Sequence, residues 1–331
     1  MKVLFLGGTG NISTECAALL RNHGHEVAIL SRGHVSVPAS YKSFRTDRKN
    51  PAAMREALGQ WLPEVVLNFI GYELSDAQAD FELFNGAVRQ YVFISSATVY
   101  AKPPPKLPLT EDTPLGNAWW DYAQKKLACE RWLLERHASS NFPVTIVRPS
   151  HTYSNLWIPN PVSSSSFTFS RRLEQGKGVF VPDDGQNPWT LTAASDFAVG
   201  LAGLVGNTES IGEAFHITSD EVLTWNQIVA EIAAALGVES PQVYKIPTDF
   251  ICDVCPQMTG SLKGDKAHPG VFDNSKIKRF VPGFQCRKAF RVGVRESLAW
   301  LREHPEQQNL SPKVDAICDE VIAAWEQSSS P

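Results

Sequence analysis

The residue types best suited to chemistry are a tyrosine and a lysine four positions apart, Tyr122 and Lys126, in the segment WDYAQKKLACERWLLERH. The segment is typical of a helix, so both side chains are expected on one face. A lysine ammonium beside a phenol favours the phenolate and lowers the pKa of the phenol. A phenol tuned in this way can pass a proton to or from an alcohol or a carbonyl near neutral pH. The pair alone is a weak signal, because many helices carry it by chance.

A glycine-rich turn near the N-terminus, GGTGNIS, gives this pair a context. Residues 2–6 are apolar and predict a buried strand, and residues 14–23 predict a helix. Gly7 permits the tight turn, and Gly10 lets the backbone approach a pyrophosphate at the start of the helix. Ser13 stands at the third glycine position, where we expect slightly looser packing. The sequence therefore predicts a dinucleotide site that includes Gly7, Gly10, Asn11 and Ile12.

A second predicted strand, residues 26–30, runs toward Arg32. An acidic residue at this position binds the ribose 2′-hydroxyl of NAD, whereas an arginine can pair with the 2′-phosphate of NADP. Arg32 therefore favours NADP over NAD. The alternative is a surface arginine that stacks on the adenine and serves either cofactor. Asp47 is either a ligand of the adenine amino group or a turn residue, and its position leaves both interpretations open.

In this order, the motifs resemble the short-chain dehydrogenase/reductase superfamily, and in particular its extended branch of NAD-dependent epimerases and dehydratases. The match includes the segment FISSATVY at residues 93–100 and an Arg-Pro pair that follows an apolar strand. The resemblance implies that Ser96 orients the substrate oxygen, that Tyr122 is the general acid or base, and that Lys126 holds the nicotinamide ribose. It further implies two cofactor contacts, Gly71 and Pro149.

Four departures from the family pattern narrow the expected activity. Ala97 and Thr98 replace the Asp-Glu pair of sugar 4,6-dehydratases, so elimination of water is not expected. Trp189 replaces an arginine that grips the diphosphate of a nucleotide sugar, and an indole has one N–H and no charge. Its ring suits stacking on a sugar face or an aromatic substrate. The helix predicted over residues 76–86 is shorter than usual, and the third glycine is replaced by Ser13.

Three residues are candidate substrate contacts: Thr98, His151 and Trp189. The resemblance places His151 near the nicotinamide, where it would bond a substrate hydroxyl or act as a second acid or base. The alternative is a structural histidine that bonds a nearby loop. Three further tryptophans would line the pocket or belong to the core: Trp119, Trp120 and Trp157.

The alternation of strands and helices predicts an α/β fold with a doubly wound parallel sheet. The strands are expected near residues 2–6, 26–30, 65–70, 91–95, 144–148 and 215–217. We expect residues 1–153 to form a Rossmann domain, to which residues 185–220 return, and residues 154–326 to form mainly a smaller substrate-binding domain. Residues 155–169 predict a long loop over the cleft, and residues 327–331 a flexible tail.

The composition excludes several classes of function. The chain has 331 residues, a net charge of −4 and dispersed basic residues, which does not favour nucleic-acid binding. No apolar run approaches the roughly 18 residues of a membrane span. The six cysteines are expected to be reduced, and the pair Cys252 and Cys255 lacks the further ligands of a metal site. We therefore expect a cytoplasmic protein with no metal, a small-molecule substrate and a possible homodimer.

The sequence thus predicts an NAD(P)-dependent oxidoreductase that transfers hydride at a hydroxyl or carbonyl carbon of a sugar-like or small oxygenated substrate. A sugar or nucleotide-sugar epimerase with tightly held NAD would use the same residues. A non-catalytic nucleotide- or RNA-binding protein is the alternative from another class. The net negative charge and the presence of all three expected catalytic residues, Ser96, Tyr122 and Lys126, argue against that alternative.

Overall fold

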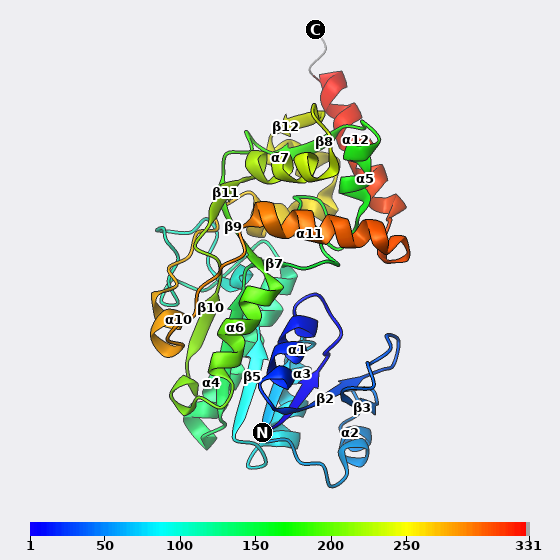
Figure 1. Ribbon diagram of the computed structural model, residues 1–331. Helices are drawn as coiled ribbons and strands as arrows, with labels where there is room; N and C mark the ends of the chain where they lie inside the picture. The colour runs from blue at the N-terminus through cyan, green and yellow to red at the C-terminus, as the bar shows by residue number, and fades with distance from the viewer. Residues whose placement is uncertain (329–331) are drawn as a thin grey trace.

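A parallel sheet of seven strands forms the centre of the lower part of the molecule in Figure 1. The computed structural model describes residues 1–328 of the chain. The strands lie in the order β10-β6-β5-β4-β1-β2-β3, and every neighbouring pair is parallel. Their bounds are β1 Lys2–Leu6, β2 Glu26–Ser31, β3 Lys42–Arg45, β4 Val65–Asn68, β5 Gln90–Ile94, β6 Val144–Pro149 and β10 Ala214–Ile217. The predicted doubly wound α/β fold is confirmed.

Helices cover both faces of this sheet, because its central strands are apolar at nearly every position. Along β1, Val3 and Phe5 belong to the core on one face, and Leu4 and Leu6 to the core on the other. The first face is covered by α1 Ser13–Asn22 and α6 Ala194–Leu204. The second face is covered by α2 Pro51–Leu58, α3 Leu74–Phe84 and α4 Asp121–Ser140.

The strand order reverses direction at β1. Strands β2 and β3 follow on one side of β1, and β4, β5, β6 and β10 follow on the other. In open α/β sheets, ligands bind outside the carboxyl ends of the strands beside such a reversal. The loops that follow β1 and β4 both open at this place, so the topology itself marks the binding site.

A smaller part of the molecule faces the carboxyl ends of these strands (Figure 1). It contains the sheets β11-β9-β7 and β12-β8 and two apolar clusters of its own. The strands are β7 His151–Tyr153, β8 Val179–Pro182, β9 Pro188–Ala193, β11 Val222–Thr224 and β12 Val243–Ile246. The remaining α-helices are α5 Thr168–Glu174, α7 Trp225–Leu236, α8 Thr248–Val254, α9 Thr259–Ser261, α10 Ser275–Phe280, α11 Phe290–Glu303 and α12 Pro312–Ser328.

Helix α7 shows how local sequence sets the bounds of an element. The hydroxyl of Thr224 accepts a hydrogen bond from the backbone N–H of Gln227 at 3.2 Å, and the Gln227 side chain accepts one from the Thr224 N–H at 2.8 Å. This capping box starts the helix. Gly237 ends it with a left-handed φ of 82°.

Three expectations about elements need correction. Strand β3 was not predicted, because three of its four residues are exposed and carry no apolar run. The strand expected over residues 65–70 ends at Asn68, where the chain turns into the site. Gln327 and Ser328 close helix α12 and do not form a flexible tail, while residues 329–331 lie outside the described residues.

The cysteines of the smaller part belong to its core. Cys252 and Cys255 are buried free thiols that pack with Cys318 in one apolar cluster. Among the helices of residues 1–328, none combines the length and the apolar character needed to span a membrane.

Candidate active site

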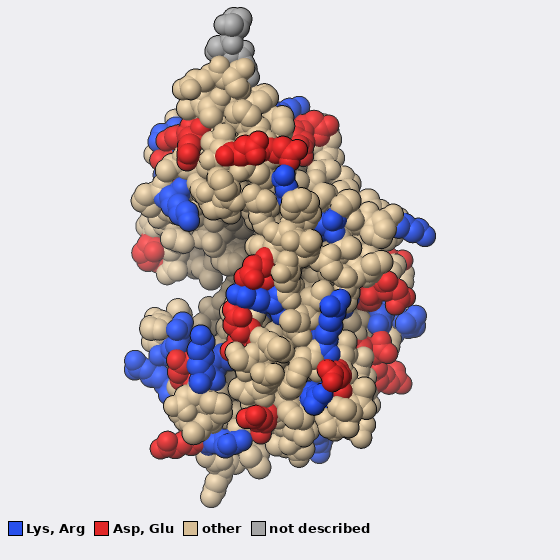
Figure 2. All heavy atoms as spheres, turned by 180° about the vertical axis from the view of Figure 1, so that it is seen from behind, with Lys and Arg blue, Asp and Glu red and all other residues tan. Residues whose placement is uncertain are grey.

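A cavity of about 690 Å³ lies between the carboxyl ends of the central strands and the smaller part of the molecule. Seen from behind in Figure 2, the surface is hollowed between these two parts. The cavity is lined by the glycine turn, the loops after β4 and β5, the start of α4, the segment after β6 and a serine-rich loop. Of the predicted site residues it brings together Gly7, Gly10, Asn11, Ile12, Ser96, Thr98, Tyr122, Lys126, Pro149 and His151.

The glycine turn is closed by its own side chains. Gly7 has a φ of +80°, and a Cβ atom there would overlap the Ile70 side chain, so only glycine fits. The hydroxyl of Ser13 accepts a hydrogen bond from the Gly10 N–H at 2.9 Å. Ser13 is buried and begins α1. The serine fixes the turn by this hydrogen bond, and the N-terminus of α1 faces the cavity.

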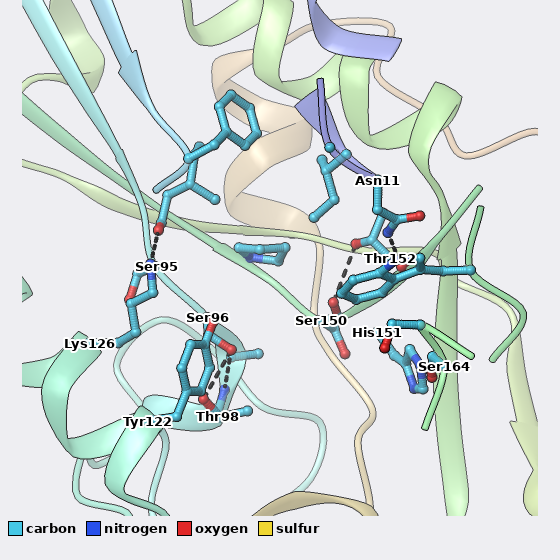
Figure 3. A pocket seen from close by; sticks show the side chains of 18 of the residues that line it. Asn11, Ser95, Ser96, Thr98, Tyr122, Lys126, Ser150, His151, Thr152 and Ser164 are labelled. Carbon is cyan, nitrogen blue, oxygen red and sulfur yellow. Dashed lines mark hydrogen bonds between the residues drawn. The ribbon is translucent and has the colours of Figure 1, made fainter. Parts of the chain in front are cut away.

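Asn11 joins the turn to the smaller part of the molecule. Its Nδ2 donates to the Thr152 carbonyl at 2.9 Å, and its Oδ1 accepts from the Ser154 hydroxyl at 2.7 Å. Both partners follow β6, so one side chain couples the loops after β1 and β6. Figure 3 shows Asn11 and Thr152 side by side at the edge of the cavity.

The loop after β4 is held by a buried polar cluster. The Asn68 side chain accepts from the Ile70 N–H at 2.9 Å, and Arg48 donates to the Ile70 carbonyl at 2.8 Å. Arg48 also forms an ion pair with Asp80 at 3.0 Å. Because Asn68 and Arg48 hold Ile70 in place, the carbonyl of the next residue, Gly71, is directed toward Lys126 on α4. No sequence pattern identified this cluster.

Lys126 is directed at the ends of two strands. Its Nζ donates to the carbonyls of Gly71 at 2.7 Å and Ile94 at 2.8 Å, and only 2% of the residue is exposed. Burial lowers the pKa of Lys126 to about 8. The distance from Nζ to the centroid of the Tyr122 ring is 5.9 Å. The lysine therefore lies beside the tyrosine, as the spacing on the helix predicts.

Tyr122 lies next to Ser96 and Thr98 (Figure 3). Burial raises the pKa of Tyr122 to about 12, the nearby Tyr72 adds to the rise, and a hydrogen bond with Ser96 opposes it. The expectation that Lys126 lowers the pKa of this phenol is not met, because the ammonium is turned toward backbone carbonyls. Tyr122 is therefore a neutral phenol near pH 7.

Ser96 is oriented by the residues that follow it. It caps a short 3-10 helix, η1 Ala97–Val99, and its Oγ accepts hydrogen bonds from the Thr98 N–H at 3.2 Å and the Thr98 hydroxyl at 3.0 Å. With its acceptor sites used in this way, the Ser96 hydroxyl has its own proton to donate. Thr98 thus acts through Ser96 and also lines the cavity.

His151 is fixed as one neutral tautomer. The Trp189 indole N–H donates to His151 Nδ1 at 3.3 Å, and His151 Nε2 lies 2.7 Å from the Ser164 hydroxyl. An indole is a donor only, so Nδ1 accepts and the ring proton sits on Nε2, which donates to Ser164. Burial, aided by the charge of Lys266, lowers the pKa of His151 to about 3. This geometry matches the alternative of a histidine that bonds the nearby loop.

Trp189 does not face the cavity. The residue is 1% exposed, its ring stacks on Trp225 with centroids 5.4 Å apart, and the backbone of Gly270 covers it closely. The expectation that Trp189 stacks on a substrate is therefore corrected, because no face of the ring is open. Its contact with the site is the hydrogen bond to His151.

Arg32 and Asp47 lie outside the lining of the cavity. Arg32 is exposed directly after β2, and its carbonyl accepts a hydrogen bond from Arg45 at 3.3 Å. The Asp47 carboxylate accepts from the Lys49 N–H at 2.9 Å, which is the turn role that the sequence left open. Within residues 1–328, neither the Arg32 nor the Asp47 side chain forms an ion pair.

Several lining residues were not predicted from the sequence. Tyr72 follows β4, and the other members come from the smaller part or from its edge: Ser163, Ser164, Ser165, Ser261, Asp265 and Lys266. Trp120 and Trp157 line the cavity, whereas Trp119 does not. Only the serine-rich composition of the loop gave a signal, since the remaining residues are brought in by tertiary packing.

The chain is similar to proteins of one enzyme family. A family model described as "NAD dependent epimerase/dehydratase family" matches residues 3–217. A 2′-dehydrokanamycin reductase of Streptomyces kanamyceticus is 25% identical over 292 residues, covering 87% of this chain and 81% of the relative. A chloroplast stem-loop binding protein of 41 kDa b from Arabidopsis thaliana is 26% identical over 265 residues, covering 75% and 67%.

Among solved structures, a UDP-glucose 4-epimerase from Bifidobacterium longum in complex with NAD⁺ and UDP has a TM-score of 0.76 at 19% identity, and the match covers 93% of this chain and 100% of the other. This likeness concerns the fold. Because the family model spans well over half of the chain, the protein belongs to the NAD dependent epimerase/dehydratase family, a family of enzymes.

Proposed function

We propose that the protein is an NAD(P)-dependent oxidoreductase that interconverts a hydroxyl and a carbonyl group on a sugar-like or small oxygenated substrate. The observation that carries the proposal is the convergence of Ser96, Tyr122 and Lys126 on one cavity that continues to the glycine turn. A bound dinucleotide would span this cavity. Its phosphates would lie at the start of α1, and its nicotinamide ring would lie beside the general acid or base.

The residues of the turn fit the cofactor. Gly7 and Gly10 line the cavity at the start of α1 and carry no side chain that would hold a pyrophosphate away from the backbone. Lys126 and Pro149 line the far end of the cavity, where they would hold the ribose and the nicotinamide. When bound, the nicotinamide supplies or accepts the hydride.

The protein's own part in the reaction is proton transfer. A phenol with a pKa of about 12 keeps its proton at neutral pH, so Tyr122 is poised to donate to the oxygen of a carbonyl group as that group is reduced. The Ser96 hydroxyl, which already accepts from Thr98, donates to the same oxygen as its negative charge grows. This protonation state suits Tyr122 to the proton-donor half of the interconversion. The similarity to a reductase points the same way.

The test is Tyr122→Phe, which removes one hydroxyl group and leaves the ring. Turnover of a panel of keto sugars with NADH and NADPH is expected to fall about 10²–10⁴-fold, the usual worth of a positioned proton donor. Affinity for the cofactor, followed by fluorescence titration, should be unchanged. Tyr41→Phe is the matched control, since it makes the same change at a tyrosine that does not line the cavity. Undiminished turnover in Tyr122→Phe would falsify the proposal.

The same titrations address the cofactor. Tighter binding of NADPH than of NADH would support a 2′-phosphate contact by the exposed Arg32. Equal binding would assign Arg32 to the adenine instead. NAD that is retained through purification would favour the alternative of an epimerase, which oxidises and re-reduces one carbon without net use of cofactor.

A further inference from the structure

One wall of the cavity, beside the start of α4, is made by a short turn of π-helix, η4 Leu262–Lys266. The turn is held firmly by side chains from other elements. Asn117 Nδ2 donates to the Gly264 carbonyl at 2.6 Å, and the Trp225 indole donates to the Lys266 carbonyl at 2.9 Å. Trp120 packs directly against the backbone of Gly264. Single π-helical turns are frequent at functional sites.

The charges on this turn are not balanced. Asp265 forms an ion pair at 3.7 Å with Lys102, whose side chain is only 2% exposed. Lys266 lines the cavity, and across residues 1–328 its ammonium makes no hydrogen bond and no ion pair. Burial lowers the pKa of Lys266, and the Asp265 charge opposes that shift. Two ammonium groups therefore share one carboxylate, and the one that faces the cavity lacks a partner.

Among the described residues that line the cavity, Asp265 is the single acidic one, so no second carboxylate there is available to Lys266. Lys126 is committed to two backbone carbonyls, and His151 is neutral. Lys266 nevertheless contributes to the low pKa of His151, and Asp265 to the raised pKa of Tyr122. The turn thus lies within electrostatic reach of the reacting end of the cavity.

The rest of this side of the cavity suits a hydroxylated ring. Hydroxyl groups come from the serine loop and from Ser261, and two indole rings, Trp120 and Trp157, also line it. Leaving a desolvated ammonium without an acceptor is costly, and a charge-assisted hydrogen bond to an anion removes that cost. We propose, resting on the proposed function, that Lys266 binds a carboxylate or phosphate group of the substrate, so that the enzyme acts on acidic rather than neutral or amino sugars.

The test is equilibrium binding to the NADH-loaded protein by calorimetry, with four probes that share one ring: D-glucose, D-glucuronate, D-glucose 6-phosphate and D-glucosamine. We expect at least one acidic probe to bind about tenfold more tightly than glucose and glucosamine, the usual worth of one charge-assisted hydrogen bond. The two acidic probes separate a carboxylate site from a phosphate site.

Variants of two neighbouring lysines make the test specific. Lys266→Gln is expected to remove the preference for the acidic probe, and Lys266→Arg to keep it. Lys263→Gln is the matched control, because Lys263 lies on the same turn but pairs with Asp249 at 2.6 Å and does not line the cavity. Retained NADH binding shows that each variant is folded.

The inference is overturned if glucosamine binds best, if no acidic probe binds, or if the acidic preference survives in Lys266→Gln. Its failure is distinct from failure of the proposed function. Tyr122→Phe should keep the acidic preference in binding while losing turnover, so turnover tests the proton donor and binding tests Lys266.

Discussion

The two walls of the cavity are built on different principles. The wall beside β1 is made of backbone and of small side chains, with Gly7 and Gly10 leaving room and Ser13 closing the turn. The wall formed by η4 and the serine loop is made of polar and charged side chains, and its charge comes from Lys266 and Asp265. The first wall offers a shape that one class of cofactor fills. The second offers a pattern of charge and hydroxyl groups that selects among substrates.

The two walls are expected to tolerate amino-acid substitutions differently. A backbone cradle fails when any side chain is added, because the atoms of the ligand take the same space. A wall of side chains can change its preference one residue at a time, with the cradle left intact. Substitutions on the first wall should therefore abolish binding, and those on the second should redirect it.

The largest effect is expected at Gly7. Gly7→Ala adds a Cβ that overlaps Ile70 at a φ of +80°, so we expect loss of NADH binding and a fall of about 2–4 kcal/mol in the free energy of unfolding. Gly24→Ala is the control, since Gly24 has a φ of +81° with nothing within 4 Å. Denaturant unfolding and NADH titration of both variants measure the contrast. Equal losses in the two would show that backbone strain alone matters and would break the comparison.

The next effect concerns Lys126, which belongs to neither wall and donates to the carbonyls of Gly71 and Ile94. Its pKa is about 8 in the folded protein against 10.5 ordinarily, so the unfolded chain binds more protons between these values and stability should rise with pH across that window. The gain approaches about 3 kcal/mol for a shift of this size. Denaturant unfolding of wild type and Lys126→Met from pH 7.5 to 10.5 isolates it. A constant difference between the two proteins would contradict the low pKa.

The smallest effect is expected at His151, on the side-chain wall. Because its pKa is near 3, the ring should stay neutral with the proton on Nε2 from pH 5 to 8. Nitrogen chemical shifts of the imidazole, measured by NMR, should therefore stay constant over that range. Trp189→Phe removes the donor to Nδ1 and should mix the tautomers. A titration of the wild-type ring near pH 6.5 would show that this wall is solvated.

The contrast between the walls also explains what could be predicted from the sequence. The glycine turn and the pair Tyr122 and Lys126 are local patterns, so their spacing alone placed them correctly on a strand end and on a helix face. Lys266 and Asp265 carry no pattern, because their place depends on packing of η4 against Trp120.

Orientation was harder to predict than position. The helix spacing put Lys126 beside Tyr122, yet the ammonium turns to the carbonyls of Gly71 and Ile94, which only the β4 and β5 loops can supply. Trp189 aligns with an arginine of the family pattern and was expected to contact the substrate. The pairing of β7 with β9 instead turns its indole toward His151. Such orientations follow from strand pairing between distant segments, which one sequence does not reveal.

The strand order has a consequence for how the chain is made. Strand β6 ends at Pro149, but its outer partner, β10, begins only at Ala214, after the chain has passed through the smaller part. During synthesis, β6 therefore remains an open sheet edge until residue 217 has emerged, and open edges recruit other strands. A fragment that stops at residue 153 would keep that edge permanently and should aggregate. Completion of the central sheet therefore requires that the first strands of the smaller part have already been synthesised, and the two parts also share the cavity.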